Sequence, residues 1–124
     1  MRALVIANSG QALASMTNLL VDLRRVDLRH ASGASHVDRQ VRSFGPALVL
    51  IDDMRWPPLA LARIQEVRSA APDAAIVVTT SELEGDWLAD ALRLGADAVL
   101  PAEADNETFL RILDEVLAPQ PLAA

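Results

Sequence analysis

Short runs of consecutive apolar residues alternate along this chain with segments in which apolar residues recur every three or four positions. A run of the first kind is typical of a strand in a parallel sheet, whereas the wider spacing is typical of a helix with one buried face. The runs predict five strands, at residues 3–7, 26–30, 47–52, 75–79 and 98–100. The spaced segments predict five helices, at residues 11–24, 37–44, 57–70, 84–94 and after 105.

This alternation of strands and helices predicts an α/β fold with three layers. A parallel sheet with helices on both faces, joined by right-handed crossovers, gives a flavodoxin-like arrangement. The strand at 26–30 mixes polar and apolar residues, so we expect it near an edge of the sheet. Gly45 and Gly95 are expected to end the second and fourth helices, and Asp105 to cap the last one. The residues expected on the buried face of the fourth helix are Leu88, Ala91 and Leu92.

Composition narrows the class of protein. Of 124 residues, 52% are hydrophobic and the mean hydropathy is +0.23, which indicates one globular domain. We place it at residues 1–118, with 119–124 as a tail or the start of a linker to an output domain. The lack of cysteine and of a membrane-spanning apolar run predicts a cytoplasmic protein with no membrane contact. A net charge of −6 argues against direct nucleic-acid binding, so we expect DNA contact only through an output domain outside this chain.

The third predicted strand ends abruptly at two carboxylates, Asp52 and Asp53. In open parallel sheets, ligands bind in the crevice beyond the carboxyl ends of the strands, so Asp52 is the first candidate for chemistry. A purely structural interpretation makes Asp52 a strand-end carboxylate that is satisfied by Thr80 and by backbone N–H groups. His30 and His36 stand apart from other metal-ligating residues, and we expect them on the surface without a metal.

The spacing of residues around Asp52 matches one known family. Pro46 lies six residues before Asp52, and Thr80 lies 28 residues after it. With these intervals, residues 1–117 resemble the receiver domain of bacterial two-component response regulators. The other residues that carry the resemblance are Leu61, Ile64 and Val67 of the third helix, Pro72, and the run Gly95-Ala96-Asp97-Ala98.

The resemblance implies a sheet order of 2-1-3-4-5 and a function in signalling. Receiver domains accept a phosphoryl group from a histidine kinase on the aspartate that ends the third strand. The Mg²⁺ ion that this step needs is held by that aspartate, by two acids ending the first strand and by a backbone carbonyl two residues past the acceptor. A lysine ending the fifth strand and a hydroxyl ending the fourth contact the phosphoryl group. An aromatic residue on the fifth strand reports the change to partners.

Carried over residue by residue, this pattern is only partly present. The acceptor position is Asp52, the carbonyl is that of Met54 and the hydroxyl is that of Thr80. The positions that depart from the family are Ala7 and Asn8 for the two acids, Ala102 for the lysine, Val99 for the aromatic residue and Trp56 for a proline. Asp53 is the alternative acceptor because Pro57 follows it at the family's interval, but that register slips by one residue against Thr80.

These departures predict a degenerate receiver domain, or pseudo-receiver. Mg²⁺ requires oxygen ligands in near-octahedral geometry, yet Ala7 supplies none and Asn8 at most a neutral one. With Ala102 in place of an ammonium group, charge on a transferring phosphoryl group would be poorly balanced. We therefore expect no cofactor, weak or absent Mg²⁺ binding, no enzymatic activity, and impaired or absent phosphorylation.

The function that remains is a protein–protein interaction module that dimerises and regulates an output domain, with transcription as the family's commonest output. The expected partners are a second copy of the chain and a histidine kinase or another regulatory protein. The residues expected on the dimer face are Trp87, Asp90, Arg93, Asp97 and Arg111. Core packing of Trp87 and a solvated surface of mixed charge explain the same residues without a partner.

Two alternative functions stay open. One is a phosphoacceptor that is phosphorylated at Asp52. The other is a sensor whose small-molecule ligand occupies the less charged pocket, because small neutral side chains suit an organic ligand better than Mg²⁺. The residues of that pocket are Ala7, Asn8, Asp52, Thr80 and Ala102.

Overall fold

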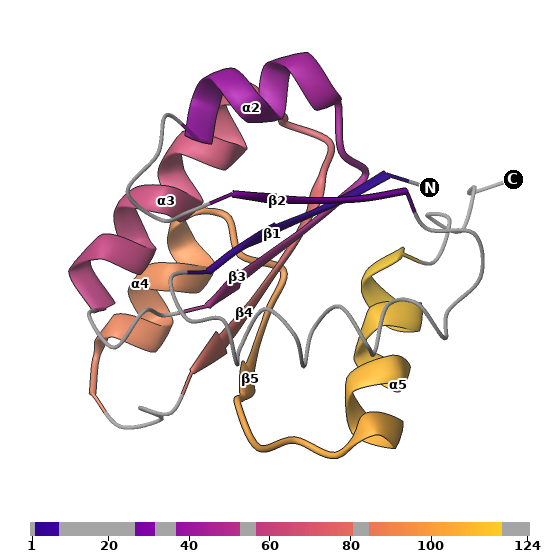
Figure 1. Ribbon diagram of the computed structural model, residues 1–124. Coiled ribbons are helices and arrows are strands. Elements are labelled where there is room, and N and C mark those ends of the chain that lie inside the picture. Colours follow the sequence, from indigo (N-terminus) through magenta and orange to yellow (C-terminus); the bar gives the residue numbers. More distant parts are fainter. Residues whose placement is uncertain (1, 8–26, 32–36, 53–56, 81–84, 118–124) are drawn as a thin grey trace, which may run out of the picture.

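The computed structural model describes residues 2–7, 27–31, 37–52, 57–80 and 85–117 (Figure 1). In this part of the chain five parallel strands form one sheet in the order β2-β1-β3-β4-β5, which confirms the predicted fold. The strands are β1 (Arg2–Ile6), β2 (Asp27–Ala31), β3 (Leu48–Asp52), β4 (Ala75–Thr80) and β5 (Ala98–Pro101). The helices are α2 (Val37–Phe44), α3 (Pro57–Ala70), α4 (Trp87–Leu94) and α5 (Asn106–Leu117). The predicted helix at 11–24 and the tail at 119–124 lie outside the described residues.

Alternation of side chains along the strands divides the core into two layers. One face of the sheet packs against α2, α3 and α4, whereas α5 covers the other face (Figure 1). On β3, Val49 and Ile51 belong to the three-helix layer, and Leu48 and Leu50 belong to the α5 layer. All four side chains are fully buried. Burial on both faces explains why this strand is a continuous apolar run.

Two glycines follow the last residues of α2 and α4, and one aspartate caps the start of α5, as the sequence predicts. Gly45 follows α2 with φ 63°, and its N–H donates to the carbonyl oxygen of Val41 at 2.9 Å. Gly95 closes α4 with φ 129°, a conformation that side chains rarely adopt. Asp105 caps α5, because its Oδ1 accepts a hydrogen bond from the Thr108 N–H at 2.7 Å.

The buried face of α4 is shifted by one position from the prediction. Trp87 and Ala91 are buried and Leu88 is half-buried, but Leu92 is 52% exposed. The expectation that Leu92 is buried is therefore wrong. Because the Trp87 ring packs into the three-helix layer, the buried stripe runs from Trp87 to Ala91 and leaves Leu92 facing solvent. Core packing of Trp87 is confirmed, so Trp87 is not an exposed interface anchor.

Asp105 makes the stability of α5 depend on pH. Hydrogen bonds from the side chain and the backbone of Thr108 lower the pKa of the Asp105 carboxyl. Since the folded-state pKa is the lower one, the stabilisation is present above the unfolded-state pKa and is lost as pH falls through the folded-state value. We expect Asp105→Ala to lower the melting temperature at neutral pH and Asp105→Asn to keep the cap while removing its acid sensitivity. Melting temperatures measured from neutral to acidic pH check this. A wild-type pH profile in Asp105→Asn would contradict it.

Candidate functional site

The carboxyl ends of β1 and β3 bring two of the candidate positions together. Ile6 pairs with Ile51 in the register of these strands, so the next residues, Ala7 and Asp52, lie side by side. Neighbouring strands are about 4.8 Å apart. Ala7 is held in place by its N–H, which donates to the carbonyl oxygen of Ala31 at 3.1 Å. Position 7 is therefore the neighbour of Asp52 at the end of β1.

The neighbour of Asp52 on β4 is a threonine that the sequence interpretation did not single out. Asp52 pairs with Thr79, and Thr80, the expected hydroxyl, is one residue further along. The period of two along a strand puts Thr79 on the α5 side of the sheet, together with Val77 and Asp52. Both threonines are buried. Only the register of β3 against β4 could identify Thr79, because the sequence pattern does not fix how two strands are aligned.

Ala102 completes the edge beyond β5. Its N–H donates to the carbonyl oxygen of Thr80 at 2.8 Å, which ties position 102 to the end of β4, and its methyl group is exposed. Asp52 is half-buried. In the described residues this edge thus offers one carboxylate, two hydroxyl groups and two methyl groups. The other candidates assigned to this pocket or its neighbourhood lie outside the described residues: Asn8, Asp53, Met54 and Trp56.

Comparison with solved structures shows what this geometry resembles. A protein from Burkholderia thailandensis E264 assigned to pilus assembly (CpaE) is 20% identical with a TM-score of 0.80, over 96% of this chain and 99% of that one. A response regulator from Thermotoga maritima is 16% identical with a TM-score of 0.82, over 95% and 98%. A CheY-like response regulator receiver domain protein from Methanospirillum hungatei JF-1 is 18% identical with a TM-score of 0.78, over 94% and 92%. No family model and no curated protein matches the sequence.

The chain has the fold of a CheY-like receiver domain. At such low identities the likeness concerns the fold. What the receiver-like domain can do depends on its own residues.

Among the described residues at the edge around Asp52, the β1 position supplies no oxygen ligand of the kind that the receiver resemblance implies for Mg²⁺. Mg²⁺ takes oxygen ligands, and the position beside Asp52 on β1 carries a methyl group instead. Ala7 is only 3% exposed and packs in the α5 layer with Val5 and Leu50, so no oxygen reaches the edge from this position. Among the described residues, no three His, Cys, Asp or Glu side chains are grouped so that they could hold a metal ion.

The position at which the receiver resemblance implies a lysine carries no cation. Position 102, where receiver domains carry a lysine, is alanine. All 11 basic residues of the sequence are arginines. Since the chain contains no lysine, no ammonium group from another position can take over this role.

Val99 is the residue that the receiver resemblance assigns to the switch aromatic position. It pairs with Val78 of β4, is half-buried and packs against the three-helix layer. A valine has a single side-chain dihedral and no ring, so it does not swing between a buried and an exposed position as a large aromatic side chain can.

The residues expected on the dimer face differ in their exposure and in their contacts within the chain. Arg93 forms an ion pair with Asp90 at 2.7 Å on the surface of α4. Asp97 is engaged within the chain, because it accepts hydrogen bonds from the Arg68 side chain at 3.1 Å and from the Ile76 N–H at 2.8 Å. Exposed residues of the same region are Leu92 on α4 and Arg111 on α5. No helix in the described ranges is long and apolar enough to cross a membrane.

Proposed function

We propose that this receiver-like domain is a protein–protein interaction module in signal transduction, and not an enzyme, that works without Mg²⁺-dependent phosphorylation. The observation that carries the proposal is the buried methyl group of Ala7 beside Asp52, at the place where a receiver domain presents a metal-binding acid. The lack of any lysine supports it. A domain that keeps the receiver fold without the metal site retains its surfaces, and surfaces are sufficient for regulation by contact.

Two kinds of regulated system fit this module. Transcription is the commonest output of receiver domains, and a linked output domain would then make the contact with DNA. The structural likeness to the Burkholderia thailandensis protein favours a role in pilus assembly instead. In both cases the partners are proteins: a second copy of the chain, and a histidine kinase or another regulatory protein.

Phosphorylation is the direct experiment. After incubation with acetyl phosphate and Mg²⁺, intact-mass spectrometry is expected to show no phosphoryl adduct on the wild-type chain, because the developing charge has neither a metal ion nor a lysine to balance it. A conventional receiver domain treated in parallel is the positive control. An adduct that disappears in Asp52→Asn would contradict the proposal and establish the phosphoacceptor alternative. A thermal shift with a metabolite panel would favour the ligand-sensing alternative.

Dimerisation is expected to use the face formed by α4, β5 and α5. Leu92 is the exposed large hydrophobic side chain of the described residues, and the Asp90–Arg93 ion pair lies on the same helix. A single exposed leucine is common on protein surfaces, so Leu92 serves here as the position at which an added charge tests this face. We expect Leu92→Glu to weaken dimerisation at least tenfold in light scattering. Gln65→Glu, on the exposed side of α3, adds the same charge elsewhere and is expected to leave the dimer intact. Equal effects of both substitutions would exclude this face.

A further inference from the structure

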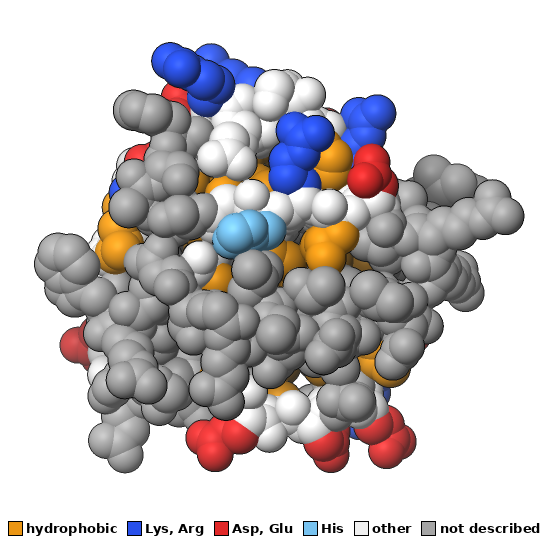
Figure 2. All heavy atoms as spheres, in the orientation of Figure 1, with side chains coloured by type: hydrophobic (Ala, Val, Ile, Leu, Met, Phe, Trp, Pro, Cys, Tyr) orange, Lys and Arg blue, Asp and Glu red, His pale blue; other side chains and the backbone are white. Residues whose placement is uncertain are grey.

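Charge is distributed unevenly along the chain. Residues 1–45 hold six of the 11 arginines and three of the 17 carboxylates. Residues 46–124 hold five arginines and 14 carboxylates. In the folded domain, basic and acidic side chains also lie in different places. Figure 2 shows basic side chains over α2 and β2 at the top of the view and acidic side chains at the bottom, near the start of α5.

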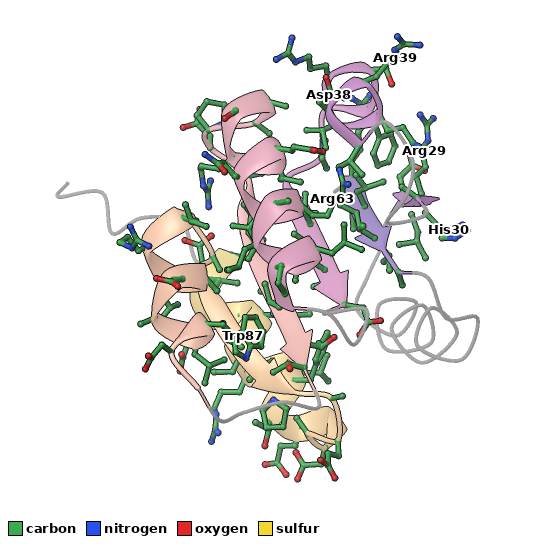
Figure 3. The ribbon with its side chains drawn as sticks, turned by 90° about the vertical axis from the view of Figure 1, so that its left-hand side faces the viewer. Arg29, His30, Asp38, Arg39, Arg63 and Trp87 are labelled. Atoms are coloured by element: carbon green, nitrogen blue, oxygen red, sulfur yellow. The ribbon has the colours of Figure 1, made fainter. Side chains whose placement is uncertain are left out.

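The basic surface, called here the arginine edge, consists of Arg29, Arg39 and Arg42. β2 is the outermost strand of the described sheet and exposes Arg29, while α2 exposes the other two. Figure 3 shows Arg39, Arg29 and His30 one after another along this edge, pointing away from the sheet. Among the described residues, the carboxylates that form ion pairs do so with other arginines. Within the described ranges, the arginine edge is thus not engaged by a carboxylate and is available to an external partner.

Phe44 holds part of this surface in place. The Arg29 guanidinium lies over the Phe44 ring, 4.4 Å from its centroid, and that of Arg2 lies at 5.9 Å. Nη1 of Arg2 also donates to the Phe44 carbonyl oxygen at 3.0 Å. A cation–π contact fixes a guanidinium without using its N–H groups, which remain available for bidentate binding of a carboxylate. The carboxylates of β2 and α2, Asp27 and Asp38, are outnumbered by these arginines.

The surface of opposite charge, called here the acidic end, consists of Glu103, Asp105 and Glu107. All three are exposed, in the loop after β5 and the first turn of α5. Arg111, four residues after Glu107 on α5, is the nearest basic residue in the sequence and acts electrostatically on Asp105, so this end is predominantly acidic. Its central carboxylate is fixed by the cap hydrogen bond at the start of α5.

We propose that the arginine edge of one copy of this domain binds the acidic end of a second copy, so that the domains associate head to tail. Because the two surfaces lie at opposite ends of the molecule, the contact is heterologous and leaves one surface of each kind free, which gives an open chain or a ring. Complementary charge selects this occupant and sets its orientation. Nucleic acid would also suit an arginine surface, but the net charge of −6 opposes it. The acidic end adjoins the α4–β5–α5 face but does not include Leu92, and the proposal does not rest on the absence of phosphorylation.

The experiment uses Leu92→Glu as the parent, so that the α4–β5–α5 face does not contribute. Two neutralising variants are then compared by sedimentation velocity at low salt. Glutamine removes each charge without creating the opposite one, and Asp105 is kept because it caps α5. The variants are Arg39→Gln/Arg42→Gln for the arginine edge and Glu103→Gln/Glu107→Gln for the acidic end.

We expect the parent to self-associate in a salt-sensitive manner and each variant alone to lose at least tenfold in association. An equimolar mixture of the two variants should form a complex that stops at one copy of each, since one variant keeps its acidic end and the other its arginine edge. Formation of that complex also shows that both variants are folded. The control Arg93→Gln removes a positive charge on α4, outside both surfaces, and should associate like the parent.

Several results would overturn the proposal. A monomeric parent at all concentrations, a mixture that associates no better than the separate variants, or an equal loss in the Arg93→Gln control would each exclude head-to-tail binding. Fluorescence anisotropy with a labelled DNA duplex tests the other occupant. Binding of the duplex by the parent that is lost in Arg39→Gln/Arg42→Gln, without self-association, would assign the arginine edge to nucleic acid.

Discussion

The triple variant Ala7→Asp/Asn8→Asp/Ala102→Lys is expected to bind Mg²⁺ and to be phosphorylated at Asp52, faster than the wild-type chain by several orders of magnitude. Two acids at the end of β1 supply the hard oxygen ligands that Mg²⁺ requires. The lysine after β5 supplies a cation for the developing charge. The backbone is already suited to this change, because position 7 lies beside Asp52 and position 102 is tied to Thr80. Phosphorylation rates by acetyl phosphate, read by intact mass, measure the effect.

Stability provides a second measurement on the same variant. Ala7 is nearly buried, so an aspartate at this position should cost about 1–3 kcal/mol of unfolding free energy without the ion. Saturating Mg²⁺ should raise the unfolding free energy again, by about 2.7 kcal/mol at a hundredfold excess over Kd. Adding Asp52→Asn removes the acceptor and one metal ligand, and is the control. If the triple variant neither gains stability with Mg²⁺ nor accepts a phosphoryl group, the three departures are not what prevents phosphorylation.

The second large effect is expected at Gly95, where Gly95→Ala should lower the unfolding free energy by about 2–4 kcal/mol. Its φ of 129° is strained for any side chain, and a Cβ would lie 2.8 Å from Nε of Arg68. Arg68 connects three segments through hydrogen bonds to carbonyl oxygens. Nη1 donates to Pro72 at 2.8 Å and to Ala74 at 2.7 Å, and Nη2 donates to Gly95 at 2.5 Å. Displacing this side chain leaves part of those acceptors without their donor. Urea unfolding measures the change.

Gly85 is the matched control for this prediction. It also has a positive φ, 105°, but a Cβ there would meet its nearest atom, Cδ1 of Trp87, only at 3.8 Å. Gly85→Ala therefore contains the backbone strain without the clash and should cost less than Gly95→Ala. In an Arg68→Ala background the difference between the two should shrink, because the clash is absent. If the difference in unfolding free energy between Gly95→Ala and Gly85→Ala is the same with and without Arg68, the clash with Arg68 does not contribute to the cost of Gly95→Ala.

The prediction for Asp52 illustrates how far sequence reasoning reaches at the site. The continuous apolar run ending in Asp52 fixed both the strand and the edge at which it ends, because only a strand buried on both faces has that pattern. Which threonine lies opposite Asp52 depends on the register of β3 against β4, and the structure places Thr79 there. Register is set by the packing of both layers at once, and this information is not local in sequence.

In α4, by contrast, the apolar spacing correctly predicted a helix but the wrong buried face. Leu88, Ala91 and Leu92 fit one stripe, but so do Trp87, Ala91 and Leu94, and the periodicity of a short helix does not choose between them. Trp87 buries far more surface than Leu92 when it enters the core, so tertiary packing rotated the helix and left Leu92 exposed. The exposed side chain at which the dimer proposal is tested is therefore a product of this rotation.

By itself, the sequence determined the order of strands and helices, the glycine and aspartate residues that end the helices, and the loss of acids and lysine around Asp52. These features are local, because they depend on residue type and on spacing of a few positions. The tertiary structure decided which residues share a surface: Thr79 beside Asp52, Leu92 facing solvent, Arg29 stacked on Phe44, and the arginine edge opposite the acidic end. Such pairings join segments far apart in the chain, and only the packing of the whole core sets their distance and orientation.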